Sequence, residues 1–273
     1  MLKQRVITAV LLLAVLLPAL FYPSPEPFCA LALVFIGAAA WEWARLNGCG
    51  ATSSYLWGGA LVVALAALWA TVGLEQPQPW LWKGVGVLWL WLAAWLLWRG
   101  VPGWARLPRL GRLLVGWLLI GAAWWALAQA RHAGVEMLLS MLVLVWVADI
   151  AAYFGGKAFG RRKLAPTISP GKSWAGVYSG WAGVAAVGVA WGWSSEASSN
   201  LYAQLGALGA VAAALGLTVL VGMSVAGDLV ESLVKRSAGM KDSSQLLPGH
   251  GGVLDRVDAL LPVLPLAMML VTW

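Results

Sequence analysis

Apolar residues in this chain occur in long blocks separated by short polar stretches. The blocks are close to the ~20 residues that an α-helix needs to cross a hydrocarbon core of ~30 Å. Backbone groups in lipid must be hydrogen-bonded within the segment, so these blocks are expected to be helices. The pattern predicts an all-α, polytopic transmembrane bundle of about nine helices, at roughly 5–22, 28–46, 55–74, 79–98, 110–130, 135–156, 174–194, 202–226 and 254–272.

The composition excludes a soluble domain. Of the 273 residues, 61% are hydrophobic and only 11% are charged, whereas soluble domains carry about 25% charged residues. The mean hydropathy is +0.80. The 20 Trp residues agree with a membrane protein, because Trp collects at membrane–water interfaces.

The basic residues predict the orientation in the membrane. Lys3 and Arg5 precede the first apolar block, and no small-residue cleavage site follows it, so we expect a retained anchor. With a cytoplasmic N-terminus, all of the 18 Lys and Arg residues except Lys83 and Arg131 fall on the cytoplasmic side, as the positive-inside rule requires. We expect a bacterial inner-membrane protein with a periplasmic C-terminus. The net charge of +7 then needs no nucleic-acid partner.

Two regions follow from this topology. Residues 1–130 would form five N-terminal spans, and residues 131–273 would form a catalytic region with cytoplasmic loops at 157–173 and 235–253. We find no internal repeat, which weakens the alternative of an inverted-repeat transporter.

Acidic residues gather near the C-terminus. Asp228, Glu231 and Lys235 share one helical face, together with Ser232, at the end of an apolar segment. An ionisable group at that depth is costly and indicates a functional site. The alternative for Asp228 is a carboxylate that is merely paired with Lys235.

A second acidic pair begins the last apolar segment. Asp255 and Asp258 are three residues apart beside Arg256, after a loop with His250-Gly251-Gly252. Carboxylates next to Lys and Arg suit a magnesium-bound polyphosphate, because Mg²⁺ prefers oxygen ligands and commonly shares carboxylates with substrate phosphates.

The loop between Gly155 and Ser173 is basic and rich in glycine. A P-loop is excluded because Pro166 stands where the first glycine is required. The loop ends directly before a predicted helix, and helix N-termini bind phosphate. The alternative is a positive-inside loop without a ligand. Asp149 and Tyr153, one turn apart in the preceding segment, mark a polar spot within the bundle.

Glu42 lies between Trp41 and Trp43 in the second apolar segment. Two interpretations stay open for it: an acid that reaches the membrane interface, or a residue of the site.

Two blocks of the sequence carry a recognisable motif. The residues are Ser232, Lys235-Arg236, Lys241-Asp242, Ser244, Leu247-Pro248, His250-Gly251-Gly252-Val253 and Asp255-Arg256-Val257-Asp258, and, in the earlier block, Asp149, Ala151-Ala152-Tyr153, Gly156-Lys157, Phe159-Gly160, Lys163-Leu164, Pro166 and Ser169-Pro170. Together the two blocks resemble the phosphatidate cytidylyltransferase (CDP-diacylglycerol synthase) family. This chain departs from the family pattern at Ile150, Ser173 and Ala175, where threonine, threonine and glutamate are usual.

The resemblance implies a magnesium-dependent dimer that joins CTP to phosphatidic acid, giving CDP-diacylglycerol and pyrophosphate in a cytoplasm-facing cavity. It implies Asp228 and Asp255 as ligands of Mg²⁺, with a second, monovalent cation such as K⁺. The other residues that it implies for catalysis are Lys241, Asp242, His250 and Asp258, and those for substrate binding are Asp149, Tyr153, Ser169, Lys172, Ser173, Lys235, Arg236 and Arg256.

The expected chemistry needs no covalent nucleophile. Both substrates are anions, so positioning and charge neutralisation would dominate catalysis. Two other functions are weighed against this one: a CTP-dependent lipid kinase, which would release CDP, and a membrane transporter.

Overall fold

The computed structural model describes residues 2–194 and 199–271, and these residues are mainly α-helical. The elements in chain order are α1 (Leu2–Phe21), α2 (Glu26–Leu46), α3 (Ala51–Val72), α4 (Pro79–Arg106), α5 (Arg109–Ala133), α6 (Val135–Phe159), β1 (Lys163–Ala165), β2 (Ser169–Ser173), α7 (Trp174–Ser194), α8 (Leu201–Ala207), α9 (Ala210–Ser237), α10 (Leu254–Val257) and α11 (Leu260–Val271).

Within the described residues, six helices are long and apolar enough to cross a membrane: α2, α3, α4, α5, α6 and α9. Helix α1 contributes the shorter apolar stretch Val6–Phe21. The all-α, polytopic membrane architecture is therefore confirmed.

Several segments end elsewhere than hydropathy predicts. The eighth segment is divided at Gly209, whose φ of 97° is readily adopted only by glycine, and α9 then continues to Ser237. The last segment is divided into α10 and α11. At ~1.5 Å per residue, the 12 residues of α11 extend over only about 18 Å, much less than a bilayer core.

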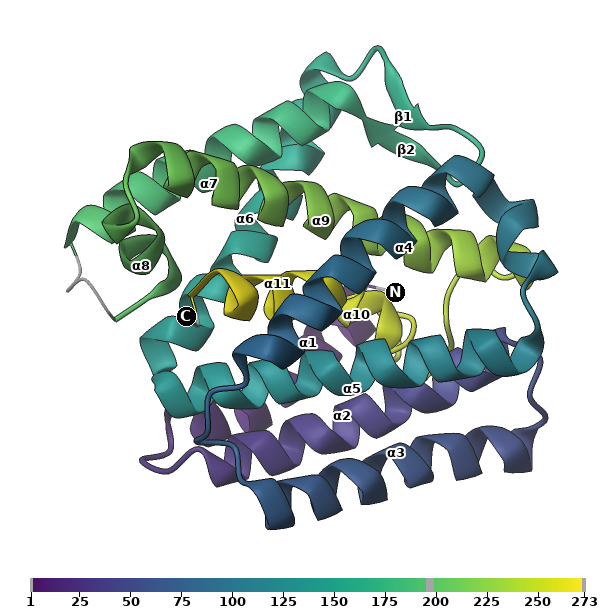
Figure 1. Ribbon diagram of the computed structural model, residues 1–273. Helices are drawn as coiled ribbons and strands as arrows, with labels where there is room; N and C mark the ends of the chain where they lie inside the picture. Colours follow the sequence, from purple (N-terminus) through teal and green to yellow (C-terminus); the bar gives the residue numbers. More distant parts are fainter. Residues whose placement is uncertain (1, 195–198, 272–273) are drawn as a thin grey trace.

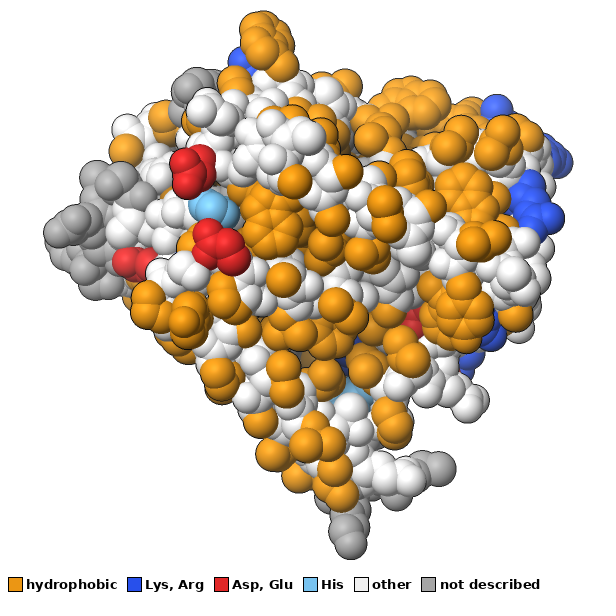
Figure 2. Space-filling view, turned by 90° about the horizontal axis from the view of Figure 1, so that it is seen from below, with side chains coloured by type: hydrophobic (Ala, Val, Ile, Leu, Met, Phe, Trp, Pro, Cys, Tyr) orange, Lys and Arg blue, Asp and Glu red, His pale blue; other side chains and the backbone are white. Residues whose placement is uncertain are grey.

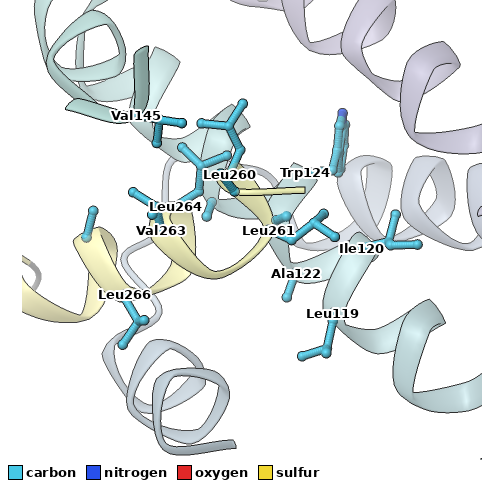
Figure 3. Packing of buried hydrophobic residues seen from close by; sticks show 14 of the residues in the cluster. Leu119, Ile120, Ala122, Trp124, Val145, Leu260, Leu261, Val263, Leu264 and Leu266 are labelled. Carbon is cyan, nitrogen blue, oxygen red and sulfur yellow. The ribbon is translucent and has the colours of Figure 1, made fainter. Parts of the chain in front are cut away.

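The helices surround α11. In Figure 1, α3, α2 and α5 lie along one side of the molecule, α6, α7 and α9 lie on the other, and α4 crosses in front. Figure 3 shows Leu260, Leu261 and Leu264 of α11 packed near Ile120 and Trp124 of α5 and Val145 of α6. Pro262 lies in the first turn of α11, where a proline removes no intrahelical hydrogen bond. Pro265 lies inside the helix and is buried, and the surrounding protein makes it tolerable there.

Most of the visible charged side chains lie at the two ends of the bundle. Figure 2 shows most of the visible acidic side chains and a histidine at one end, most of the visible Lys and Arg side chains at the other, and a mainly hydrophobic surface between them. The basic end carries the β1–β2 hairpin and the segment after α9 (Figure 1). The fold thus gathers the two basic loops at one end of the bundle.

Candidate active site

A cavity of about 580 Å³ opens between α6, α7, α9 and the β1–β2 hairpin. Its volume is typical of a small-molecule site. Three lysines and two aspartates line it, and the rest of the wall consists mainly of small or apolar residues. The charged lining residues are Asp149, Lys157, Lys163, Lys172 and Asp228. Such a wall suits a ligand that carries both negative charge and apolar groups.

The narrow packing of α6 against α7 depends on glycine. A Cβ on Gly176 would lie 2.9 Å from the carbonyl oxygen of Ala152, and one on Gly180 would lie 2.9 Å from that of Ala148. These glycines, four residues apart, let the two backbones approach closely, as is common between membrane helices. All four residues also line the cavity, so this contact shapes its wall.

The basic loop folds as a β-hairpin, which the sequence did not predict. Strands β1 and β2 pair antiparallel, with Lys163 opposite Ser173 and Ala165 opposite Ser169. Ser173 then caps α7, because its hydroxyl accepts a hydrogen bond (3.2 Å) from the Gly176 amide. The hairpin places Lys172 and Ser173 at the cavity, whereas Ser169 is not one of the lining residues.

Asp228 in α9 pairs with Lys172 in β2. The Lys172 Nζ atom lies 2.7 Å from Asp228 Oδ2, and the two side chains are 23% and 32% exposed. Asp228 Oδ1 also accepts a hydrogen bond from Ser232 at 3.2 Å. The pairing of Asp228 with Lys235, which was the alternative, is therefore wrong in its partner: the ion pair is with Lys172 of the hairpin.

Lys235 instead joins two other carboxylates, deeper in the protein. Its ammonium group lies 2.6 Å from Asp255 Oδ1 and also forms an ion pair with Glu231, one helical turn away. Glu231 is only 1% exposed, and a carboxylate buried to that degree requires a partner. The sequence placed Glu231 on the same helical face as Asp228 and Lys235 but assigned it no catalytic or binding role.

Asp255 lies in the short helix α10, outside the long apolar helices. The amides of Gly252 (2.8 Å) and Ser243 (2.9 Å) donate to its Oδ2 atom, and the Ser243 hydroxyl oxygen lies 2.9 Å from the same atom. Burial alone would raise the pKa of Asp255, but the hydrogen bonds and the Lys235 charge outweigh it and lower this pKa to about 2. Asp255 is therefore ionised at neutral pH.

Close backbone contact brings α9 to the turn before α11. A Cβ on Gly227 would lie 2.6 Å from the carbonyl oxygen of Asp258 and 2.8 Å from Pro262, so only glycine fits. The contact brings Asp258 close to Asp228, which lies 30 positions earlier in the chain. The shared site that the sequence predicts for this group of acids stays a prediction.

Among the six predicted catalytic residues, all of which lie in the described part of the chain, Asp228 alone lines the main cavity. Lys241 and Asp242 instead line a groove of about 550 Å³, beside Trp41 and Arg45 of α2. The segment 240–246 nevertheless reaches the charged cluster, because Ser243 contacts Asp255.

The remaining predicted residues contact backbone groups. Arg236 donates to the carbonyl oxygens of Ile168 and Met240, each at 3.4 Å, and so joins the hairpin to the segment after α9. Arg256 donates to the carbonyl oxygen of His250 at 2.6 and 3.0 Å. The two arginines therefore stabilise the loops before and after them through hydrogen bonds to backbone carbonyl groups.

The donor atoms are of the kind that a divalent cation requires. Asp228, Glu231, Asp255 and Asp258 supply carboxyl oxygens, which Mg²⁺ prefers. Lys172 pairs with Asp228, and Lys235 pairs with Glu231 and Asp255. Among the described residues, however, no three acidic, His or Cys side chains converge closely enough to hold a metal as they stand. The two lysines occupy the carboxylates that the resemblance implies as ligands.

A helical membrane protein with a basic cavity beside ionised carboxylates belongs, by fold and site, to the class of membrane enzymes that act on phosphate-bearing substrates. The model of the cytidylyltransferase family matches residues 3–273. The chain belongs to this family.

Curated relatives extend over nearly the whole chain. It is 40% identical to a phosphatidate cytidylyltransferase of Pseudomonas aeruginosa, over 97% of this chain and 95% of the relative. It is 38% identical to a phosphatidate cytidylyltransferase of Haemophilus influenzae, over 97% of this chain and 96% of the relative. A Staphylococcus aureus enzyme of the same name matches at 36%, over 55% of each chain.

Proposed function

We propose that this protein transfers the cytidylyl group of CTP to phosphatidate, giving CDP-diacylglycerol and pyrophosphate. The observation that carries the proposal is the similarity to phosphatidate cytidylyltransferases over 97% of the chain. The cavity supports it, because lysines and small apolar residues line the same space. A lipid phosphate and a nucleotide triphosphate both need such positive charge.

The reaction joins two anions. An oxygen of the lipid phosphate forms a bond to the α-phosphorus of CTP, and the bond from that phosphorus to the bridging oxygen breaks, which releases pyrophosphate. Lys157, Lys163 and Lys172 line the cavity and would offset the repulsion between the substrates. A phosphate monoester is already ionised near neutral pH, so no strong base is required.

We place the nucleotide phosphates at the hairpin and the lipid along α6 and α7. Lys172 and Ser173 lie at the hairpin end of the cavity, whereas Ala148, Ala152 and Gly180 supply an apolar wall. Tyr153, with 63% of its surface exposed, and Asp149 lie on the same helix as that wall.

We propose Asp228 and Asp255 as the residues that would hold Mg²⁺, with a monovalent cation such as K⁺ as a second ion. Their carboxylates belong to a cluster with more acids than lysines, which supports the assignment. A bound Mg²⁺ would neutralise developing charge on the phosphates. Lys241, Asp242, His250 and Asp258 stay predictions as catalytic residues, as do Ser169, Lys235, Arg236 and Arg256 as substrate ligands.

We propose that the basic end faces the cytoplasm of a bacterial inner membrane. The first turns of α1 lie at this end, because the Thr8 hydroxyl donates to the Pro248 carbonyl oxygen at 3.0 Å. Helix α11 ends near α8 at the opposite end (Figure 1). This arrangement agrees with a cytoplasmic N-terminus and a periplasmic C-terminus. The homodimer that the resemblance implies remains part of the proposal.

Product analysis tests the reaction. The purified protein is incubated with labelled CTP, phosphatidic acid and Mg²⁺, and the products are separated. Formation of CDP-diacylglycerol with pyrophosphate supports the proposal. Release of CDP with transfer of the γ-phosphoryl group would instead identify a lipid kinase. Substrate flux into proteoliposomes without a new lipid product would identify a transporter.

A further inference from the structure

Glu42 of α2 is a fully buried carboxylate with four hydrogen-bond donors from the opposite end of the chain. Its Oε1 atom accepts from the Ser244 hydroxyl at 2.5 Å and the Val253 amide at 3.0 Å. Its Oε2 atom accepts from the Ser243 hydroxyl at 3.1 Å and the Leu254 amide at 2.7 Å. Each oxygen thus receives one hydroxyl and one backbone N–H, which compensates for burial of the charge.

This carboxylate takes the place of an N-terminal cap on α10. The residue that precedes the helix, Val253, has no side chain that can accept a hydrogen bond. The amides of Val253 and Leu254 at the start of α10 would otherwise lack acceptors. Glu42 satisfies both from a helix more than 200 residues away in sequence, so it fixes where α10 begins.

The approach of Glu42 also explains a glycine of the His250-Gly251-Gly252 sequence. A Cβ on Gly252 would lie 2.3 Å from Glu42 Oε1 and 2.1 Å from Ser243 Oγ. No larger residue fits between these groups, although Gly252 has no positive φ angle. The glycine is therefore required by the contact with Glu42.

Ser243 connects Glu42 to Asp255. The Ser243 hydroxyl lies 3.1 Å from Glu42 Oε2 and 2.9 Å from Asp255 Oδ2. Its amide and the amide of Gly252 donate to the same Asp255 carboxylate. The groups that hold Asp255 in place are thus carried by the segment that Glu42 anchors.

We propose that Glu42 is a positioning residue for the reaction: it holds residues 243–254 so that Asp255 keeps its orientation toward Lys235 and the charged cluster. Glu42 does not line the main cavity, so its effect on the reaction is exerted through residues 243–254. The inference depends on the proposed function at one point, namely that Asp255 takes part in catalysis.

The test is Glu42→Gln in the full-length protein. The amide keeps the size of the side chain but presents an NH₂ group to one of the two backbone N–H donors, which then has no acceptor. We expect kcat to fall by at least about tenfold, and we expect faster hydrogen–deuterium exchange in the segment 243–255. The Gln129→Ala protein is the matched control, because Gln129 is also buried and bonded to Trp82 (3.1 Å) and to the carbonyl oxygen of Gln76 (2.6 Å). It should lose thermal stability and keep its specific activity.

A double-mutant comparison separates positioning from a general loss of stability. In an Asp255→Asn background, Glu42→Gln should cause little further loss of activity, because residues that act as a unit are not additive. Gln129→Ala should have the same small effect in both backgrounds. Independent effects of Glu42→Gln and Asp255→Asn that multiply would overturn the proposal, as would normal kcat and exchange in Glu42→Gln.

Two further variants keep the test decisive if Glu42→Gln does not fold. Ser243→Ala removes the hydroxyl that contacts both carboxylates, whereas Ser244→Ala removes a hydroxyl that donates to Glu42, accepts from the Leu246 amide and does not contact Asp255. We expect the larger loss of kcat from Ser243→Ala, and equal losses would refute the link. Wild-type protein that forms no CDP-diacylglycerol would refute the proposed function instead, while the exchange measurement would still test the anchoring by Glu42.

Discussion

Replacing Lys172 tests where CTP binds. Lys172 lines the cavity from strand β2 and contacts Asp228 at 2.7 Å. We expect Lys172→Ala to raise the KM for CTP more than the KM for phosphatidate, because we place the nucleotide phosphates at the hairpin. The apolar wall formed by α6 and α7 would bind the lipid in the variant as before.

The structure limits the size of this effect. A hydrogen bond to a charged group contributes ~1.5–3 kcal/mol. The Lys172–Asp228 pair, with both side chains partly exposed, is worth ~0–1 kcal/mol and is disturbed when phosphate binds. The net contribution is then about 1–2 kcal/mol, which corresponds to roughly a 5- to 30-fold increase in the KM for CTP.

The assay measures initial rates against each substrate in turn, with the other saturating, on detergent-purified protein. Arg161→Ala is the matched control: it removes one positive charge next to the same hairpin, but Arg161 is exposed and does not line the cavity. We expect less than a twofold change in either KM for this control, because exposed charges are screened by salt. Equal changes in both KM values for Lys172→Ala, or the same change in both variants, would refute the placement.

Three further outcomes follow from the structure. Asp228→Asn should lower activity by several orders of magnitude across a magnesium titration, because a lost metal ligand removes charge stabilisation of the transition state. The amount of folded protein should not fall, because a neutral amide is cheaper to bury than a carboxylate. Near-normal turnover would exclude a metal role for Asp228. Gly252→Ala should lower stability by ~1–3 kcal/mol in thermal unfolding, because its Cβ would lie 2.1 Å from Ser243 Oγ; an unchanged melting temperature would contradict this contact. A reporter that is active only in the cytoplasm should be silent when fused after Trp273, and activity there would indicate an even number of crossings.

Hydropathy located the helices because long apolar runs have few alternatives to helix in lipid. The predicted segment 174–194 coincides with α7, and 110–130 lies within α5. The segment 202–226 ended too early, since hydropathy falls at Asp228 while α9 continues to Ser237. The polar residues of this last part face the cavity and the charged cluster, where the helix no longer depends on lipid.

The pairing of charges was less predictable than their location. The sequence placed Asp228 and Lys235 on one helical face, and a helical pair was the local alternative. The hairpin introduced a competing cation, Lys172, from a loop that composition described only as basic. Pairing between segments depends on how α6, α7 and α9 pack, and this depends on backbone approach at glycines such as Gly176 and Gly180. Sequence periodicity within one helix contains no such information.

Glu42 shows why an acid in an apolar segment is difficult to interpret from sequence. An acid at the interface would be exposed, but Glu42 is 0% exposed. Hydropathy averages over ~20 residues, and one carboxylate in such a window changes the average little. Its four donors belong to residues 243–254, so no local pattern could identify them. A buried carboxylate without donors would be strongly destabilising, so an acid deep in an apolar helix predicts partners elsewhere in the chain. In this protein the partners are in the segment 243–254, which precedes Asp255, so α2 supports the charged cluster from outside the main cavity.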